Sequence, residues 1–262
     1  MMQGLPAISA LWVGKELSPL ERLTAASFLA HGHPFHLYAY QPVANVPPGV
    51  TLADANAIVP ERDIFLSHGG YAHFADWFRW RMLKERGGFW VDMDVVCLRP
   101  FVFEREVVFG YEAGKLPNVA VMRFPAGHPV CAEMESRCNA PNDFRPGDTL
   151  RDKLRKAVRR HLLGNRRGRV RWGEAGGPSG FRRALAQCGL QDAGLPFTYF
   201  YPVTWQNAAC LFDRTLARDE ALFADTHAVH LWNEILRQEK IDKRGPFVKG
   251  SFISSMLERY GV

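Results

Sequence analysis

Residues 74–94 read FADWFRWRMLKERGGFWVDMD, and this stretch carries the strongest pattern in the chain. A helical run ends at the Gly87-Gly88 turn, and a short apolar strand then leads to Asp92 and Asp94. In an extended segment these two acids share one face with Trp90, while the opposite face, which points to the core, is made of Phe89, Val91, Met93 and Val95. Carboxylates at this spacing suit a hard cation such as Mg²⁺ or Mn²⁺, held together with substrate phosphates. The simpler interpretation is two surface acids at a strand end.

The helix before the turn places an acid and a base on an unexpected side. At about 100° per residue, Arg81 and Lys84 share a face that suits solvent, whereas Asp76 and Arg79 fall on the far side with Leu83. Burying an acid and a base is costly unless they are paired or hold a ligand. We therefore expect Asp76 and Arg79 to contribute to a site, with a plain ion pair one helical turn apart as the alternative.

The rest of the chain alternates apolar strands with helices. Residues 7–13, 18–30 and 35–40 read as strand, helix and strand, with Ser18 and Pro19 opening the helix, and this order opens an α/β fold with a parallel sheet. Further strands are predicted at 107–111, 118–124, 199–203 and 227–232, and further helices at 71–86, 128–138, 149–163, 178–187 and 248–260. The Pro-rich stretch 42–50 reads as a loop. We see no linker, so a single domain is expected.

Composition narrows the class of protein. The 262 residues are 47% hydrophobic, enough for one large α/β domain, and the net charge of +6 suits an anionic partner. The five cysteines include no Cys-x-x-Cys pair, so neither a disulfide framework nor a zinc site is indicated. We find no signal peptide and no apolar stretch of membrane-spanning length. The expected location is the cytoplasm, with any membrane contact peripheral.

The motif of 74–94 resembles a known family. Its order, Asp-x-x-Arg and then Gly-Gly-x-aromatic-x-Asp-x-Asp, is similar to the sugar-binding region of GT-A-fold glycosyltransferases of the DxD type. That group includes the α1,4-glycosyltransferase, capsular-polysaccharide and Och1-like mannosyltransferase families, and large clostridial glucosylating toxins have a similar core. The family usually has Tyr where this chain has Trp90. The resemblance implies one Rossmann-like GT-A domain over residues 1–262, with a mostly parallel central sheet flanked by helices and a basic helical insertion at about 139–172.

Other segments resemble the family in the same order. LWVG (11–14) is similar to a first strand whose Trp lies against the nucleotide base, which would be Trp12, although a core Trp is equally consistent. NVAVMRFPAGHP (118–129) resembles a strand with a sugar-contacting Asn, here Asn118. GEAGGPSGF (173–181) resembles a turn in which backbone amides around Gly176, Gly177 and Pro178 approach the substrate. HLWN (230–233) resembles a segment whose His completes a metal shell.

The resemblance implies roles for individual residues. Asp94, His230 and Asp92 would be the metal ligands, with Trp232 packing behind the histidine. Asp92, Asp94 and Arg79 would be the catalytic residues. A basic residue of the C-terminal loop, Arg237, Lys240 or Lys243, would clamp the diphosphate, and the sequence does not choose among them. The donor-binding set would be Trp12, Asp76, Arg79, Trp90, Asp92, Asn118, Gly177 and Lys240. His31, His33 and His36 also form a suggestive cluster, but they straddle a helix end and a strand start, so we expect no metal there.

These residues lead to one function and three alternatives. We expect metal-dependent, retaining transfer of a sugar from a nucleotide-diphosphate sugar, with Mn²⁺ or Mg²⁺ and a UDP-sugar favoured over a GDP-sugar. The acceptor would be a glycan or glycolipid in bacterial surface polysaccharide or lipopolysaccharide synthesis. One alternative is an effector-type transferase that modifies a protein. Another is a haloacid-dehalogenase-like phosphatase, since DMDVV (92–96) also fits its motif, and a third is a non-catalytic nucleotide-binding domain.

A basic segment at 148–171 contains ten Lys and Arg residues. Leu150, Leu154, Val158 and Leu162 recur every four residues in it, which is typical of an amphipathic helix. We expect the leucines to pack on the domain and the basic face to be solvated. The alternative is docking to an anionic membrane or a phosphorylated glycan acceptor. Nucleic acid is not expected, because the segment lacks interleaved aromatic residues.

Overall fold

The computed structural model describes residues 4–216 and 221–262, and the chain divides into two compact units. The first, here called the sheet unit, comprises Met1–Ala55, Gly88–Arg123 and Gly194–Val262. The second, the helical unit, comprises Asn56–Gly87 and Phe124–Ala193. The assignment of residues 1–262 to one GT-A domain stays a prediction.

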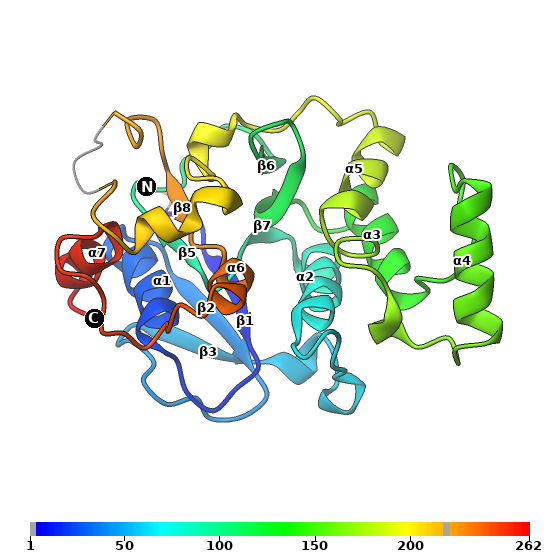
Figure 1. The fold of residues 1–262 in the computed structure, drawn as a ribbon, viewed down its shortest axis with the longest axis horizontal. Coiled ribbons are helices and arrows are strands. Elements are labelled where there is room, and N and C mark those ends of the chain that lie inside the picture. The colour runs from blue at the N-terminus through cyan, green and yellow to red at the C-terminus, as the bar shows by residue number, and fades with distance from the viewer. Residues whose placement is uncertain (1–3, 217–220) are drawn as a thin grey trace. The chain divides into compact units, whose positions relative to one another are not determined.

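A six-stranded sheet forms the centre of the sheet unit, in the order β3-β2-β1-β4-β7-β6 (Figure 1). β1 pairs in parallel with β2 and β4, β2 pairs in parallel with β3, and β6 and β7 are antiparallel. The predicted α/β fold with a mostly parallel sheet is therefore confirmed. The strands are β1 (Ile8–Trp12), β2 (Phe35–Ala39), β3 (Val50–Asp54), β4 (Gly88–Val91), β6 (Val108–Tyr111) and β7 (Pro117–Phe124).

Two short strands form a second, antiparallel sheet in the same unit. β5 (Val95–Cys97) pairs with β8 (Ala228–His230), so residues from the middle and the end of the chain become neighbours. The helices of this unit are α1 (Pro19–Ala30), α6 (Asn233–Gln238) and α7 (Phe252–Tyr260). α1 begins as predicted, since the Ser18 N–H donates to the Glu21 carboxylate at 2.8 Å and Pro19 is the first helical residue.

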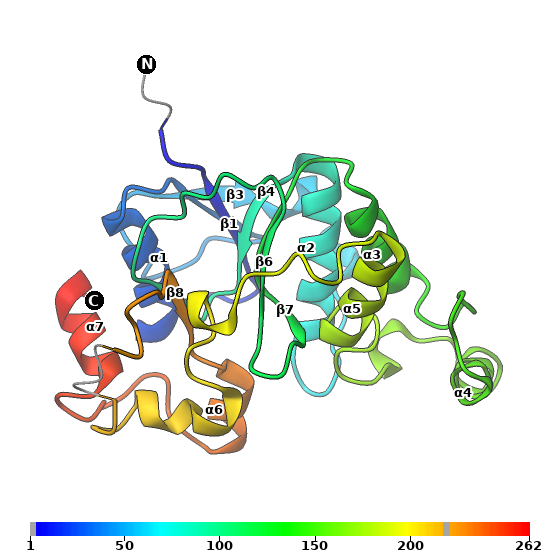
Figure 2. The same cartoon turned by 90° about the horizontal axis from the view of Figure 1, so that it is seen from above.

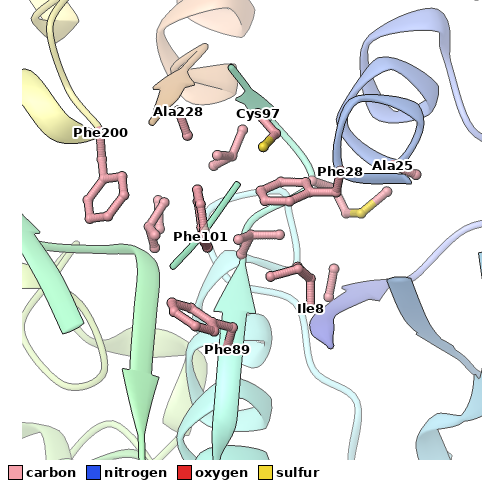
Figure 3. Close-up of a cluster of buried hydrophobic side chains, with 14 of the residues drawn as sticks. Ile8, Ala25, Phe28, Phe89, Cys97, Phe101, Phe200 and Ala228 are labelled. Atoms are coloured by element: carbon pink, nitrogen blue, oxygen red, sulfur yellow. The ribbon is translucent and has the colours of Figure 1, made fainter. Parts of the chain in front are cut away.

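Aromatic side chains fill the core next to the strand that precedes Asp92 (Figure 3). The Phe101 ring lies at the centre of this cluster, with its centroid 5.1 Å from Phe28, 5.4 Å from Phe89 and 5.6 Å from Phe200. Edge-to-face and tilted contacts of this kind stabilise a core beyond the area they bury. The contact of Phe89 with this cluster fixes β4, and this in turn holds the residues that follow β4 in place.

The helical unit packs α2 (Ala72–Arg86), α3 (Pro129–Asn139) and α5 (Pro178–Gln187) side by side, as Figure 2 shows. Trp80 of α2 is fully buried among Phe124 and Phe181, and its indole N–H donates to the Gly176 carbonyl at 2.6 Å. α2 ends at Arg86, and Gly87, which caps it, has a φ of +66°. A Cβ at Gly87 would lie 2.5 Å from the Ala126 amide nitrogen, so only glycine fits this turn.

Two local predictions were wrong, and one strand was not predicted. Residues 199–203 are not a strand: Phe197–Tyr199 is a 3₁₀ turn, and Pro202 has no N–H for a ladder. The strand that was not predicted is β3, which begins at Val50, the last residue of the predicted loop 42–50. The strand before the acids ends at Val91, so Met93 and Asp94 lie in a turn rather than on one extended face.

The basic segment forms the predicted helix, α4 (Leu150–His161), but with its faces reversed. Leu150 is 84% exposed and Leu154 is 66% exposed, whereas Lys156 is only 3% exposed. The expectation that the leucines pack on the domain was wrong. The reason is a set of ion pairs on the inner face, among them Lys156 with Asp148 at 2.7 Å, which satisfy the buried charges.

Within the described residues, no helix has both the length and the apolar character needed to cross a bilayer.

Candidate functional site

Three predicted ligands meet in the sheet unit. One potential ligand atom from each of Asp92, Asp94 and His230 lies within 4.8 Å of the others. Asp92 and Asp94 follow β4, and His230 ends β8. Two carboxylate oxygens and one imidazole nitrogen form a donor set that Mn²⁺ and Mg²⁺ sites use, with the imidazole favouring the transition metal.

Asp94 is held by the chain segment that carries the histidine. Its Oδ2 lies 3.2 Å from Nε2 of His230 and accepts the backbone N–H of Asn233 at 2.8 Å. Burial alone would raise the pKa of Asp94, but the charge and hydrogen bond of His230, the Asn233 N–H and the Lys243 charge lower it overall. The Asp94 carboxylate is therefore kept ionised, as a metal ligand must be.

His230 is buried among aromatic rings. Its ring centroid lies 4.3 Å from that of Trp232 and 5.9 Å from that of Tyr201. Burial would lower the pKa of His230, but the carboxylates of Asp94, Asp92 and Glu112 raise it overall. Trp232 has the predicted packing position, and its indole N–H donates to the Val203 carbonyl at 2.9 Å. The imidazole is thus oriented by packing and by one carboxylate.

Asp92 is oriented by the residue two positions earlier. The indole N–H of Trp90 donates to Asp92 Oδ1 at 2.8 Å, and the Asp92 backbone N–H donates to the Ala120 carbonyl at 2.9 Å. Trp90 is buried, so the structure shows it supporting the Asp92 carboxylate, and its role in donor binding stays a prediction. The sequence identified both residues but not the hydrogen bond between them.

Asn118 lies on β7 with both ends of its amide engaged. Its Nδ2 donates to Glu112 at 2.8 Å, and its Oδ1 accepts the Ala120 N–H at 2.8 Å. The sequence did not identify Glu112, although its charge raises the pKa of His230. The available signal was an acid directly after the strand 107–111, the same position that drew attention to Asp92.

A cavity of about 310 Å³ lies beside Asp92, Asp94 and His230, here called the ligand cluster. Trp232 and Glu112, which act on His230, form part of its wall, and Trp205 is 46% exposed in it. The lining therefore offers one exposed indole, that of Trp205, together with carboxylate and amide groups, which is suited to a polar organic ligand. The complete lining is Glu112, Ala113, Tyr201, Thr204, Trp205, Gln206, Asn207 and Trp232.

The structure distinguishes the three basic candidates of the C-terminal loop. Lys243 Nζ lies 5.2 Å from the centre of the Trp12 ring and pairs with Glu21 at 2.6 Å, and its charge lowers the pKa of Asp94. Arg237 pairs with Glu234 on the surface, and Lys240 is exposed in a left-handed turn. Of the three, Lys243 is the one that contacts Trp12 and acts on Asp94, and the choice of a diphosphate clamp stays a prediction. The donor-binding role predicted for Lys240 stays a prediction.

The remaining predicted residues lie in the helical unit. Asp76 and Arg79 are buried and paired, with Arg79 Nη2 3.0 Å from Asp76 Oδ1. Burial raises the pKa of Asp76, and the Arg79 charge opposes that increase. The pair therefore has the geometry of the simpler interpretation, and its roles in donor binding and catalysis stay predictions.

The Gly-Pro turn shows why its glycines are required. A Cβ at Gly176 would lie 2.5 Å from the Asp76 Cβ, and one at Gly177 would lie 2.6 Å from the Gly173 Cα. Gly177 caps α5, and Pro178 is the first residue of that helix. Close packing accounts for both glycines, while contact between Gly177 and a donor stays a prediction.

The polar atoms of the ligand cluster fit a bound cation. Among the residues that the structure describes, Nδ1 of His230 and Oδ1 of Asn233 are buried without a hydrogen-bond partner. Buried polar groups are nearly always satisfied in a folded protein, and a bound ion is one explanation for an exception. Other such atoms lie outside the cluster, for example Nε2 of His73 and Nε of Arg137. The cluster thus combines two carboxylates, an imidazole and unsatisfied polar atoms within one short radius.

Two family models match the chain. Residues 51–112 match the glycosyltransferase sugar-binding region containing a DXD motif, which includes Asp76, Arg79, Asp92 and Asp94. Residues 171–248 match the α1,4-glycosyltransferase conserved region, which includes Gly176 and His230. The motif of 74–94 and the HLWN segment therefore lie within regions that match the families indicated by the sequence. Together with the α/β sheet, they confirm the predicted GT-A class.

Solved structures that resemble the chain include three glycosyltransferases. The PaToxG glycosyltransferase is 14% identical with a TM-score of 0.46, and the match covers 70% of each chain. GlyE of Streptococcus pneumoniae TIGR4 is 13% identical with a TM-score of 0.46, covering 98% of this chain and 61% of GlyE. An active-site mutant of LgtC is 8% identical with a TM-score of 0.41, and the match covers 86% of this chain and 87% of the LgtC chain.

This chain spans less than two thirds of the GlyE chain. At such identities and TM-scores, these likenesses support no conclusion about substrate or mechanism. No curated protein matches the sequence. The two matched regions decide the class: this chain is a glycosyltransferase with a DXD sugar-binding region and an α1,4-glycosyltransferase region.

Proposed function

We propose that this glycosyltransferase moves a sugar from a nucleotide-diphosphate sugar to a glycan acceptor, using a divalent cation held by Asp92, Asp94 and His230. The observation that carries the proposal is the meeting of these three side chains within 4.8 Å. A UDP-sugar is the favoured donor, and bacterial surface polysaccharide or lipopolysaccharide is the favoured product. Retention of configuration is inferred from the family resemblance alone.

The bound Mn²⁺ or Mg²⁺ would supply Lewis-acid stabilisation of the negative charge that develops on the departing diphosphate. Asp94 would bind the ion directly, since its neighbours keep its carboxylate ionised. His230 would add a neutral nitrogen ligand once its proton leaves, because metal binding requires a deprotonated imidazole. Asp92, held by Trp90, would share the ion or accept a hydroxyl of the donor.

Lys243 and Trp12 suit the nucleotide end of the donor. The ammonium over the indole ring could meet a phosphate, while the other face of a half-buried indole offers a stacking surface for a base. Asp76 and Arg79 are proposed, by resemblance, to orient sugar hydroxyls. Their orienting role would lower the barrier by fixing the geometry of the reacting sugar.

The acceptor is proposed to enter the cavity lined by Glu112, Trp205 and Trp232. Indole faces stack against the apolar faces of sugar rings, and carboxylate and amide groups bond their hydroxyls. The cavity adjoins His230 through Trp232, so an acceptor there would be close to the proposed ion. This placement is consistent with a small oligosaccharide rather than a folded protein surface as the acceptor.

The decisive experiment is donor hydrolysis and donor binding by Asp94→Asn. The wild type should show a Mn²⁺-dependent thermal shift with one nucleotide sugar from a panel of UDP-, GDP- and CDP-sugars, and it should hydrolyse that donor slowly. Asp94→Asn should lose the Mn²⁺-dependent shift and at least roughly a hundredfold of the hydrolysis rate. Asp192→Asn, at an exposed position, is the matched control. A wild-type rate in Asp94→Asn would refute the metal role.

A further inference from the structure

Helix α4 presents its apolar stripe to solvent and its charges to the protein. Leu150, Leu154 and Val158 fall on one side at roughly 100° per residue, and they are 84%, 66% and 38% exposed. Leu162, directly after the helix, is 76% exposed and prolongs the stripe. Monomeric soluble proteins rarely expose several large apolar residues in a row, and such patches mark interaction sites.

The inner face of α4 is polar, and its charged side chains attach the helix to its unit. Lys156 donates to the Asp143 carbonyl at 3.0 Å and pairs with Asp148 at 2.7 Å. Arg159 makes two hydrogen bonds to Glu174, at 2.7 and 3.0 Å. These contacts fix the rotation of the helix, so the leucines cannot turn inward without breaking buried ion pairs.

The helix also lies apart from the rest of its unit. In Figures 1 and 2, α4 runs separately from the group formed by α2, α3 and α5. It falls between the two matched family regions, which cover residues 51–112 and 171–248. The stripe is therefore a feature of this chain that neither glycosyltransferase region accounts for.

Basic residues border the stripe on both sides. Arg151 lies at one edge, Lys153 and Arg160 lie at the other, and all three are exposed. The segment after the helix adds more exposed arginines, namely Arg166, Arg169 and Arg171. An apolar stripe between basic edges is the pattern of a helix that lies in the plane of an anionic lipid surface.

We propose that α4 docks this enzyme on an anionic lipid bilayer, with the stripe Leu150, Leu154, Val158 and Leu162 at the headgroup boundary. The charge pattern favours lipid over a second copy of the chain. Two copies that buried the same stripe would bring Arg151 and Lys153 against like charges of the other copy, which is unfavourable. Anionic headgroups would instead neutralise these two residues, while Arg160 already pairs with Asp143 at 3.3 Å.

The experiment is flotation of the full chain with vesicles of phosphatidylglycerol and phosphatidylethanolamine, compared with vesicles of phosphatidylcholine alone. The wild type should float with the anionic vesicles and remain behind with the neutral ones, and added salt should weaken its binding. Leu154→Ser should weaken binding at least about tenfold. Arg151→Glu and Lys153→Glu should each weaken it at least roughly fivefold.

Val102→Ser is the matched control, because Val102 is 67% exposed in the sheet unit. It should bind vesicles like the wild type, and Leu154→Ser should keep the wild-type rate of donor hydrolysis in solution. Equal flotation with both vesicle types, or wild-type flotation of Leu154→Ser, would overturn the proposal. The proposal would also be overturned if light scattering showed a dimer that Leu154→Ser dissociates, and if neither the wild type nor any variant bound vesicles. Because flotation needs no donor, its result is independent of the proposed metal chemistry.

Discussion

Nε2 of His230 lies 3.2 Å from Oδ2 of Asp94 because two short strands pair their backbones. In the β5–β8 ladder, Val95 is the partner of His230, and the Leu231 N–H donates to the Asp94 carbonyl at 2.8 Å. The ligand cluster is therefore built on main-chain hydrogen bonds rather than on a mobile loop. A site held in this way is organised before any ligand arrives.

The first prediction concerns His230 as a metal ligand. His230→Asn should reduce the Mn²⁺ affinity by at least about a hundredfold, because it removes a ligand rather than a supporting contact, and supporting contacts alone are worth roughly 10- to 100-fold. The measurement is Mn²⁺ titration followed by electron paramagnetic resonance. His227→Asn is the control, since His227 bonds to the Pro100 carbonyl outside the cluster. Equal affinity in both variants would contradict the assignment.

The second prediction separates acceptor binding from donor chemistry. Trp205→Ala should raise the KM for a saccharide acceptor roughly tenfold, since stacking on an exposed indole is lost. The rate of donor hydrolysis and the Mn²⁺ affinity should not change, because Trp205 lines the cavity but is not in the ligand cluster. Trp172→Ala, at a similarly exposed indole in the helical unit, serves as the control. An unchanged acceptor KM would move the acceptor away from this cavity.

The ligand cluster was predictable because its members carry local signatures. Asp92 and Asp94 follow a turn of two glycines, and His230 sits in a short segment with its own family pattern. Glu112 and Lys243 were harder to identify, since an isolated acid and one of three loop cations acquire meaning only through contacts across the fold. Contacts between distant residues leave no periodicity in the sequence.

Helix α4 shows the same limit at the level of packing. Its four-residue leucine spacing predicted the helix and its two faces, but not which face would be buried. That choice depends on Asp148 and Glu174, which lie outside the helix and pair with Lys156 and Arg159. Patterning assumes that apolar faces turn inward, and specific ion pairs overrode that assumption here.

The third prediction tests the buried pair of Asp76 and Arg79. Arg79→Met should destabilise the protein by about 3–5 kcal/mol, because it leaves the buried Asp76 carboxylate without its partner. The double variant Asp76→Leu, Arg79→Met should recover much of that loss, since no charge remains buried. Urea unfolding of the two single variants and the double variant gives the coupling free energy. Additive losses would show that the pair is not coupled.

The same double variant also addresses the predicted catalytic role. If the pair only stabilises the fold, the recovered protein should transfer sugar at the wild-type rate. If Asp76 and Arg79 orient the donor, transfer should stay at least roughly a hundredfold slower although the fold is stable. We expect the second outcome, measured as kcat for transfer at saturating donor.

The fourth prediction concerns Gly176. Gly176→Ala should cost about 1–3 kcal/mol, because the new methyl would lie 2.5 Å from Asp76 Cβ and 2.7 Å from Cys138 Sγ. The Asp76 Cβ is fixed by the backbone of α2, and the Cys138 side chain is buried and has a single rotatable bond. Gly70→Ala is the control, because a Cβ at Gly70 would meet open space. Gly114 also has open space, but its φ is positive, so an alanine there would be strained for a different reason. Equal urea midpoints for the two variants would contradict the close packing.

The last prediction is a dependence of stability on pH that arises from His73. Burial lowers the pKa of His73 from 6.5 to about 4, the His68 charge adds to this, and Glu174 opposes it. The unfolded chain therefore binds the proton first as the pH falls below 6.5, so stability declines from there to about pH 4 and levels off below. In the wild type, Ser67 Oγ lies 2.6 Å from His73 Nδ1. The variant His73→Asn keeps a side chain that can bond to this hydroxyl, but asparagine does not titrate.

Between pH 7 and 4 the free energy of unfolding of the wild type should fall by on the order of 2 kcal/mol more than that of the variant. Urea unfolding at each pH measures both values, and parallel curves would contradict the assignment.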